Sequence, residues 1–140
     1  MKKIITYGTF DLITPGHIAL LKYAKSLGDY LIVGLSTDEF NVIKHKTSYL
    51  NYEQRKNVME AIRYVDEVIP EENWDQKIND IKNNHIDTLV MGNDWEGSDK
   101  FSYLEAYCHV VFFPRLSDFS STNFRNFIKD HQNEDNNQNS

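Results

Sequence analysis

The sequence contains few of the residues that cross-link or interrupt small folds. Of its 140 residues, one is cysteine and three are proline. The single cysteine, Cys108, cannot form a disulfide within the chain. It lies in an apolar stretch before Val110 and Val111, which is typical of a buried structural thiol and not of a nucleophile. Stability must therefore come from packing, and a chain of this length with 40% hydrophobic residues can bury one core.

Long apolar runs and an excess of positive charge are also missing. No apolar run is long enough to span a bilayer, and the N-terminus lacks the apolar region and cleavage site of a signal peptide. We therefore expect a cytoplasmic protein with no membrane contact. The formal net charge of -6 argues against a nucleic-acid partner, because such proteins carry a basic surface. A few lysines and helix N-termini can still make a local phosphate site.

The end of the chain and the scattered histidines offer little chemistry. Residues 131–140 are polar throughout, so they cannot bury surface, and we expect a disordered tail after one domain over residues 1–130. The histidines outside residues 8–17 are scattered and lack the paired spacing of metal ligands, and the chain has one cysteine. The sequence therefore predicts no metal site made of histidine and cysteine.

What the sequence does contain is a regular alternation of strand and helix patterns. Apolar, β-prone runs predict strands over residues 4–7, 29–35, 65–69, 87–91 and 109–113, the third ending before Pro70. Helices are expected over residues 15–27, 37–43 and 51–62, around 74–81, and from 120 to 128. Strands that are apolar throughout predict an α/β fold: a single Rossmann-like domain with about five parallel strands and helices on both faces. Ligands bind such sheets at the carboxyl ends of the strands.

The most informative segment, residues 8–17, joins the first expected strand to the first expected helix. Thr14 can cap this helix, and Pro15 can occupy its first position. Gly16 lets a backbone or ligand approach closely, and His17 can point back over the helix start, where unpaired N–H groups suit a phosphate. The spacing alone fits equally well a strand–turn–helix in which Thr14 is a cap and His17 is packed.

Thr14-Pro15-Gly16-His17, after Gly8-Thr9-Phe10-Asp11, resembles the signature of the cytidylyltransferase-like nucleotidyltransferase superfamily. That signature is His-x-Gly-His, or Thr-x-Gly-His in some branches. The similarity is to the glycerol-3-phosphate cytidylyltransferases of teichoic acid synthesis and runs from Lys3 to about Lys129, with further blocks at residues 36–41, 52–56, 62–66 and 90–97. It implies transfer of a cytidylyl group from CTP to glycerol 3-phosphate, with release of pyrophosphate, Mg²⁺ as cofactor and a homodimer.

The resemblance also implies roles for residues along the whole chain. The implied catalytic residues are Thr14, His17, Lys44, Lys46 and Arg115. The implied nucleotide contacts are Thr9, Phe10, Thr14, Pro15, Gly16, His17, Lys46, Met91, Gly92, Asp94, Arg115, Phe119, Ser120, Ser121 and Thr122. The implied acceptor-phosphate contacts are Lys44 and Lys77, with Arg63 and Arg55 as further phosphate or structural partners. Asp11 would help to place Mg²⁺.

Several of these residues have simpler explanations. Lys44 and Lys46 can be solvated lysines, and Lys77 lies on an expected surface helix. The two arginines can pair with acidic side chains, for which the candidates are Glu53, Glu60 and Asp66. Asp11 can be a turn former.

Two departures from the glycerol-phosphate branch concern the substrates. Thr14 stands where that branch has histidine; its hydroxyl can donate to a phosphate oxygen but cannot carry positive charge. Residues 115–122 retain Arg115 and the hydroxyl pair but place Asp118 near the phosphates. Three alternatives stay open: adenylyl transfer, another phosphorylated acceptor, and a non-catalytic nucleotide-binding relative.

Overall fold

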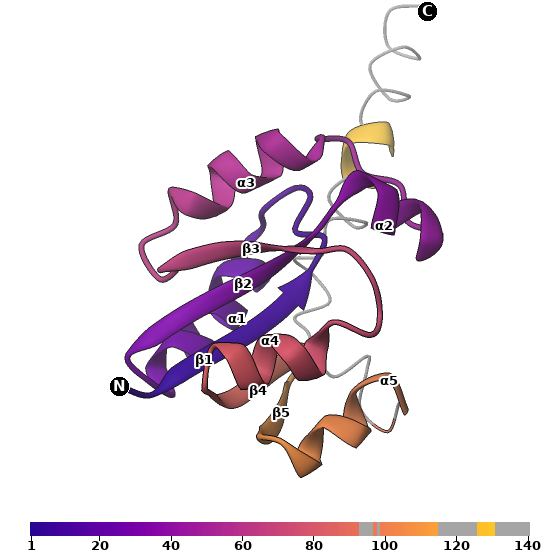
Figure 1. Cartoon of the computed structure of the whole chain (residues 1–140). Helices are drawn as coiled ribbons and strands as arrows, with labels where there is room; N and C mark the ends of the chain where they lie inside the picture. The colour runs from indigo at the N-terminus through magenta and orange to yellow at the C-terminus, as the bar shows by residue number, and fades with distance from the viewer. Residues whose placement is uncertain (93–96, 98, 115–125, 131–140) are drawn as a thin grey trace, which may run out of the picture.

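The computed structural model describes residues 1–92, 97, 99–114 and 126–130. One parallel sheet runs in the order β3-β2-β1-β4-β5 (Figure 1), with strands β1 (Lys3–Gly8), β2 (Tyr30–Ser36), β3 (Glu67–Glu71), β4 (Ile86–Gly92) and β5 (His109–Phe113). The helices are α1 (Pro15–Ser26), α2 (Asp38–Ile43), α3 (Tyr52–Glu60), α4 (Lys77–Asn83), α5 (Asp99–Ser102) and a 3-10 helix, η2 (Tyr103–Ala106). The predicted five-stranded parallel sheet is confirmed.

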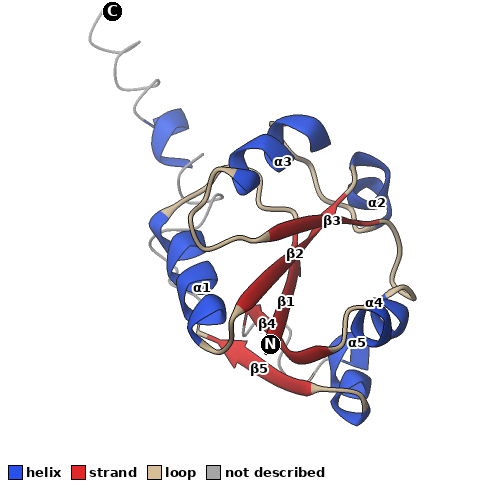
Figure 2. Ribbon diagram, turned by 60° about the vertical axis from the view of Figure 1, so that its left-hand side comes forward, coloured by secondary structure: helices blue, strands red, loops and turns tan. Residues whose placement is uncertain are grey.

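Helices cover both faces of the sheet, as the apolar strands predicted (Figure 2). Neighbouring residues of β1 point to opposite faces, so Ile4 and Ile5 belong to two separate core clusters. The Ile4 cluster contains Leu21 of α1 and Met59 of α3, and the Ile5 cluster includes residues of α4, α5 and η2. Both faces of the sheet are therefore covered and shielded from water, which explains why the strands carry apolar residues almost without alternation.

The strand β3 differs from its prediction. The sequence predicts an end before Pro70, but the strand continues to Glu71, with Pro70 opposite Leu35 and Glu71 opposite Ser36. β3 is an edge strand, where no further strand needs the N–H group that proline lacks. The longer strand brings Glu71 to the carboxyl end of the sheet.

The strand order reverses beside β1. From β1 the chain proceeds outward through β2 to β3 and then returns to β4 on the other side of β1. In parallel sheets of this kind, the reversal opens a crevice at the carboxyl ends of the two strands concerned. The turn into α1, the end of α2 and the last residues of β3 all lie at this end of the sheet.

The last predictions to compare with the structure concern the C-terminal residues and the absence of a membrane span. The predicted tail over residues 131–140 lies outside the described residues, as does the start of the last predicted helix, of which residues 126–130 are seen to be helical. No helix in the described part of the chain has both the length and the apolarity needed to cross a membrane.

Candidate active site

Thr14 and His17 hold each other at the start of α1. Thr14 is the N-cap, in an extended conformation, and Pro15 begins the helix. The backbone N–H of Thr14 donates to Nδ1 of His17 at 3.1 Å, and the Thr14 hydroxyl lies 3.4 Å from the same nitrogen. Because Nδ1 accepts this bond, the proton of the neutral imidazole is assigned to Nε2. His17 is therefore oriented to offer an N–H donor.

The turn between β1 and α1 is compact and strained. Phe10 has a φ of 46°, which costs roughly 1–3 kcal/mol for a residue with a side chain, yet its ring is buried in the core and offsets that cost. The ring meets the imidazole of His17 edge-on, with centroids 5.6 Å apart. A Cβ atom added to Gly8 would lie 2.9 Å from the Phe10 ring, so glycine is needed there for close packing. Gly8, Phe10 and His17 thus form one continuous contact at the end of β1.

Arg55 is surrounded by hydrogen-bond acceptors of the protein itself, as expected for a structural residue. Its side chain is fully buried, and it donates to the carbonyl oxygens of Thr9 at 2.9 Å, Ser36 at 2.7 Å and Leu50 at 3.1 Å. Its ion pair is with Asp38, at 2.8 Å, and not with the acidic candidates named from the sequence. Arg55 therefore ties the ends of β1 and β2 to the loop before α3. Its predicted contact with an acceptor would require some of these bonds to break.

Asp11 is likewise engaged by the backbone. Its two carboxylate oxygens accept hydrogen bonds from the N–H groups of Tyr49 at 2.7 Å and Leu50 at 2.9 Å. The side chain is buried, which does not fit a dedicated Mg²⁺ ligand, since this ion keeps several waters. Among the residues that the structure describes, no three His, Cys, Asp or Glu side chains gather to hold a metal. Asp11 anchors the loop after α2, and the Mg²⁺ requirement stays a prediction.

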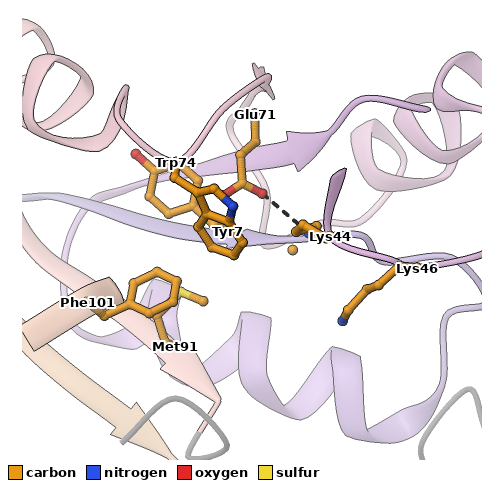
Figure 3. Close-up of a pocket in the computed structure, with 8 residues that line it drawn as sticks. Tyr7, Lys44, Lys46, Glu71, Trp74, Met91 and Phe101 are labelled. Carbon is orange, nitrogen blue, oxygen red and sulfur yellow. Dashed lines mark ion pairs between the residues drawn. The ribbon is translucent and has the colours of Figure 1, made fainter. Parts of the chain in front are cut away.

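A pocket opens at the carboxyl ends of β1, β3 and β4 (Figure 3). Its lining combines cations and a carboxylate with aromatic and apolar walls: Tyr7, Gly8, Lys44, Lys46, Glu71, Trp74, Met91 and Phe101. Two of the lysines that the sequence selected thus share one cavity, as the phosphate-site hypothesis requires. Because Gly8 also packs on Phe10, this cavity lies next to the His17 turn.

Lys44 is the C-cap of α2 and points inward. Its side chain is only 7% exposed, and Nζ donates to the Ser36 hydroxyl at 2.6 Å and to the Thr9 hydroxyl at 3.3 Å. Glu71 lies 3.7 Å away. Burial lowers the pKa of Lys44 to about 8; attraction by Glu71 opposes this change, and repulsion by Lys46 and Lys77 adds to it. Lys44 is therefore not an ordinary solvated lysine.

Lys77 contradicts the expectation of a surface helix position. Its side chain is fully buried, with Nζ 2.9 Å from Oε2 of Glu71. Aromatic rings surround the ammonium group, with Tyr7 at 4.7 Å, Trp74 at 5.2 Å and Phe101 at 5.3 Å to the ring centroids. The ion pair and the three aromatic rings hold the ammonium group of Lys77 in a fixed position beside the pocket.

The remaining predicted residues fall into three groups. Thr9 lies next to the pocket, because its hydroxyl accepts a hydrogen bond from Lys44, and Met91 is one of the lining residues. Gly92 ends β4 at the same end of the sheet. Arg63 is exposed and precedes β3, so it lies toward the amino end of the sheet, away from the pocket. Outside the described residues are Asp94, Arg115, Phe119, Ser120, Ser121 and Thr122.

Glu71 and Ser36 are site residues that the sequence did not reveal. Ser36 is fully buried and donates to Oε1 of Glu71 at 2.7 Å. Both residues end strands, which is the position that binds ligands in a parallel sheet. Glu71 was missed because the sequence predicts that this strand ends before Pro70. Recognising that an edge strand tolerates proline would have extended the strand to Glu71.

Comparison with known proteins agrees with this arrangement. The family model described as cytidylyltransferase-like matches residues 5–129, which include every element around the pocket. The chain belongs to the cytidylyltransferase-like family.

Relatives within the cytidylyltransferase-like family include two of nearly the same length. The chain is 58% identical over 128 residues to the glycerol-3-phosphate cytidylyltransferase of Bacillus subtilis strain 168, covering 91% of this chain and 98% of the relative. It is 54% identical over 125 residues to the enzyme of the same name from Staphylococcus aureus strain NCTC 8325, covering 89% and 93%. A crystal structure of a lipopolysaccharide core biosynthesis protein from Thermoplasma volcanium GSS1 has a TM-score of 0.69 at 22% identity, covering 82% of this chain and 98% of that one, and it supports the fold alone.

Proposed function

We propose that this protein is a glycerol-3-phosphate cytidylyltransferase, which transfers the cytidylyl group of CTP to glycerol 3-phosphate and releases pyrophosphate. The observation that carries the proposal is identity above 50% to two enzymes of that name over about nine tenths of the chain. The pocket supports it independently, because Lys44 in its lining and Lys77 beside it are both too deeply buried around Glu71 for a merely solubilising role.

The proposed chemistry needs positioning more than acid–base catalysis. A phosphate oxygen of the acceptor attacks the α-phosphorus of CTP, forming one P–O bond while the bond to pyrophosphate breaks. The second pKa of a phosphate monoester is about 6, so the nucleophile is already anionic at neutral pH. The difficulty is bringing two anions together, and the lysines at the pocket lower that cost. No general base is needed.

His17 provides the complementary function on the nucleotide side. Its Nε2–H can donate to a phosphate oxygen as negative charge builds up on the departing pyrophosphate. Thr14 replaces the histidine of the glycerol-phosphate branch, and its backbone N–H fixes the imidazole of His17. The substitution therefore leaves the orientation of His17 intact, which favours an active enzyme over a non-catalytic relative.

Three further properties stay predictions. A requirement for Mg²⁺ and a homodimer are implied by the family resemblance, and a cytoplasmic location is expected from the sequence, which lacks a signal-peptide pattern and an apolar run that could span a bilayer. No step above depends on them.

A pyrophosphate-release assay tests the proposed function. Each of CTP and ATP is incubated with glycerol 3-phosphate, phosphocholine, a longer polyol phosphate, or glycerol as the control without phosphate, in the presence of Mg²⁺. We expect release with CTP and glycerol 3-phosphate, and none with glycerol. Release with ATP in place of CTP would contradict the cytidylyl assignment, and release with phosphocholine alone would contradict the acceptor. CTP binding without turnover on any acceptor would indicate a non-catalytic relative.

The pH dependence of the acceptor step follows from Lys44. Only its protonated form attracts the acceptor phosphate, and its pKa is lowered to about 8. We expect kcat/KM for glycerol 3-phosphate to rise as the acceptor loses its second proton near pH ~6 and to fall as the pH rises through about 8. Initial rates between pH 5 and 10 at saturating CTP measure this. A profile that stays flat up to pH 10 would show that Lys44 does not bind the acceptor as a cation.

A further inference from the structure

One buried carboxylate lies between the two acceptor-side lysines. Glu71 is 2% exposed, and its two oxygens face different partners: Oε2 is 2.9 Å from Nζ of Lys77, and Oε1 is 3.7 Å from Nζ of Lys44. Figure 3 shows Glu71 pointing toward Lys44, with the dashed line marking their ion pair. One side chain therefore fixes two cations from different segments, one at the C-cap of α2 and one at the first residue of α4.

Ser36 completes the connection on the Lys44 side. Its hydroxyl donates to Oε1 of Glu71 at 2.7 Å and accepts from Nζ of Lys44 at 2.6 Å. A hydroxyl has one proton, so the direction of both bonds is set once Glu71 accepts. Ser36 and Glu71 are paired across β2 and β3, which makes the relay as rigid as the sheet. Loss of the carboxylate would leave both the hydroxyl and the lysine without a fixed direction.

The balance of charge at the pocket also depends on Glu71. Three charged groups act on Lys44: Glu71 of β3, Lys77 of α4 and Lys46 of the loop after α2. This group of four side chains therefore contains one negative charge and three positive charges. On β1, Tyr7 donates to Asp80 of α4 at 2.9 Å and stays neutral, because burial and then Asp80 raise its pKa. Without Glu71, the ammonium group of Lys44 in the pocket would face Lys46 in the same lining and Lys77 buried beside it with no carboxylate between them, and such repulsion favours the loss of a proton from Lys44.

We propose that Glu71 is a positioning residue that holds Lys44 and Lys77 in place as a pre-aligned pair of cations for the acceptor phosphate. This inference rests on the proposed function, since it gives Glu71 a role within the acceptor site. Glu71 is not a general base: its oxygens already receive hydrogen bonds from Ser36 and Lys77, and the acceptor phosphate needs no proton removed.

The matched variants are Glu71→Gln, which keeps the shape and removes the charge, and Glu71→Asp, which keeps the charge on a shorter side chain. Glu67→Gln is the control, because Glu67 begins the same strand and accepts a hydrogen bond from Tyr30 at 2.8 Å, at the other end of the sheet. Three quantities are measured for each: the dissociation constant of glycerol 3-phosphate by calorimetry without CTP, KM and kcat for both substrates, and the pKa of Lys44 by NMR titration of its side chain.

For Glu71→Gln we expect glycerol 3-phosphate to bind at least about tenfold more weakly while KM for CTP changes little. The pKa of Lys44, and with it the alkaline limb of kcat/KM, should move down by about one unit. Glu71→Asp should leave that limb in place but weaken acceptor binding, because its carboxylate cannot reach both lysines. Glu67→Gln should match the unmodified protein in every measurement.

The inference is overturned if Glu71→Gln leaves the Lys44 pKa unchanged, or if it weakens CTP and glycerol 3-phosphate equally. Should Glu71→Gln fail to fold, Glu71→Asp decides: binding of glycerol 3-phosphate as tight as in the unmodified protein would show that the carboxylate does not need to reach both lysines. Failure of the proposed function has a different signature. The unmodified protein would then form no CDP-glycerol, while the NMR titration would still report whether Glu71 controls Lys44.

Discussion

Replacing His17 by alanine is expected to lower kcat by about 10²–10³-fold while the dissociation constant of CTP changes by less than about threefold. The imidazole donates where charge develops, so its bond strengthens in the transition state and contributes little to ground-state binding. The helix start is expected to remain, because Thr14 still caps it and Pro15 still begins the first turn, although the Thr14 N–H loses its acceptor on His17. Single-turnover rates and CTP calorimetry on the same preparation measure the two quantities.

The control for this variant is His109→Ala. His109 is exposed and begins β5, toward the amino end of the sheet, so its removal should leave kcat unchanged. Equal losses of kcat and CTP affinity in His17→Ala would mean that the imidazole serves only for binding. Loss of folding is monitored by circular dichroism.

Replacing Arg55 by methionine is expected to destabilise the protein by roughly 3–5 kcal/mol, a large fraction of the ~5–15 kcal/mol that keeps a domain folded. Methionine is of similar length but offers no donors. The carbonyl oxygens of Thr9, Ser36 and Leu50 would then be left without this partner, and the ion pair with Asp38 would be lost. Urea denaturation measures the change in the free energy of unfolding.

Lys56→Met is the matched control, since Lys56 is the next residue of α3 and is only partly buried. We expect it to alter the free energy of unfolding by less than about 0.5 kcal/mol. If Arg55→Met proved as stable as this control but bound glycerol 3-phosphate more weakly, Arg55 would contact the acceptor as the family resemblance implied, and its buried position would have to change on binding.

The prediction of the fold from the sequence depended on patterns within short segments. The run Ile4-Ile5-Thr6-Tyr7 predicted a buried strand, and Thr14-Pro15 predicted the start of a helix; both are confirmed. The same local reasoning was wrong at Pro70, because whether proline is tolerated depends on the strand's place in the sheet. It also missed the short helices α5 and η2, which are four residues each and have too few turns to show a period.

The sequence by itself determined the order of the five strands, the strand–turn–helix at residues 8–17, and the family, because each is encoded in the order of residues along the chain. The tertiary structure decided how the ionisable side chains are used. Arg55 pairs with Asp38, and Lys77 turns inward to meet Glu71, although neither partner lies within one helical turn of it. These pairs form because strands and helices from distant segments exclude water around the charges, and the cost of burying a charge makes each one find a partner. That cost exists only in the folded protein, so no local pattern could predict which residues would share it.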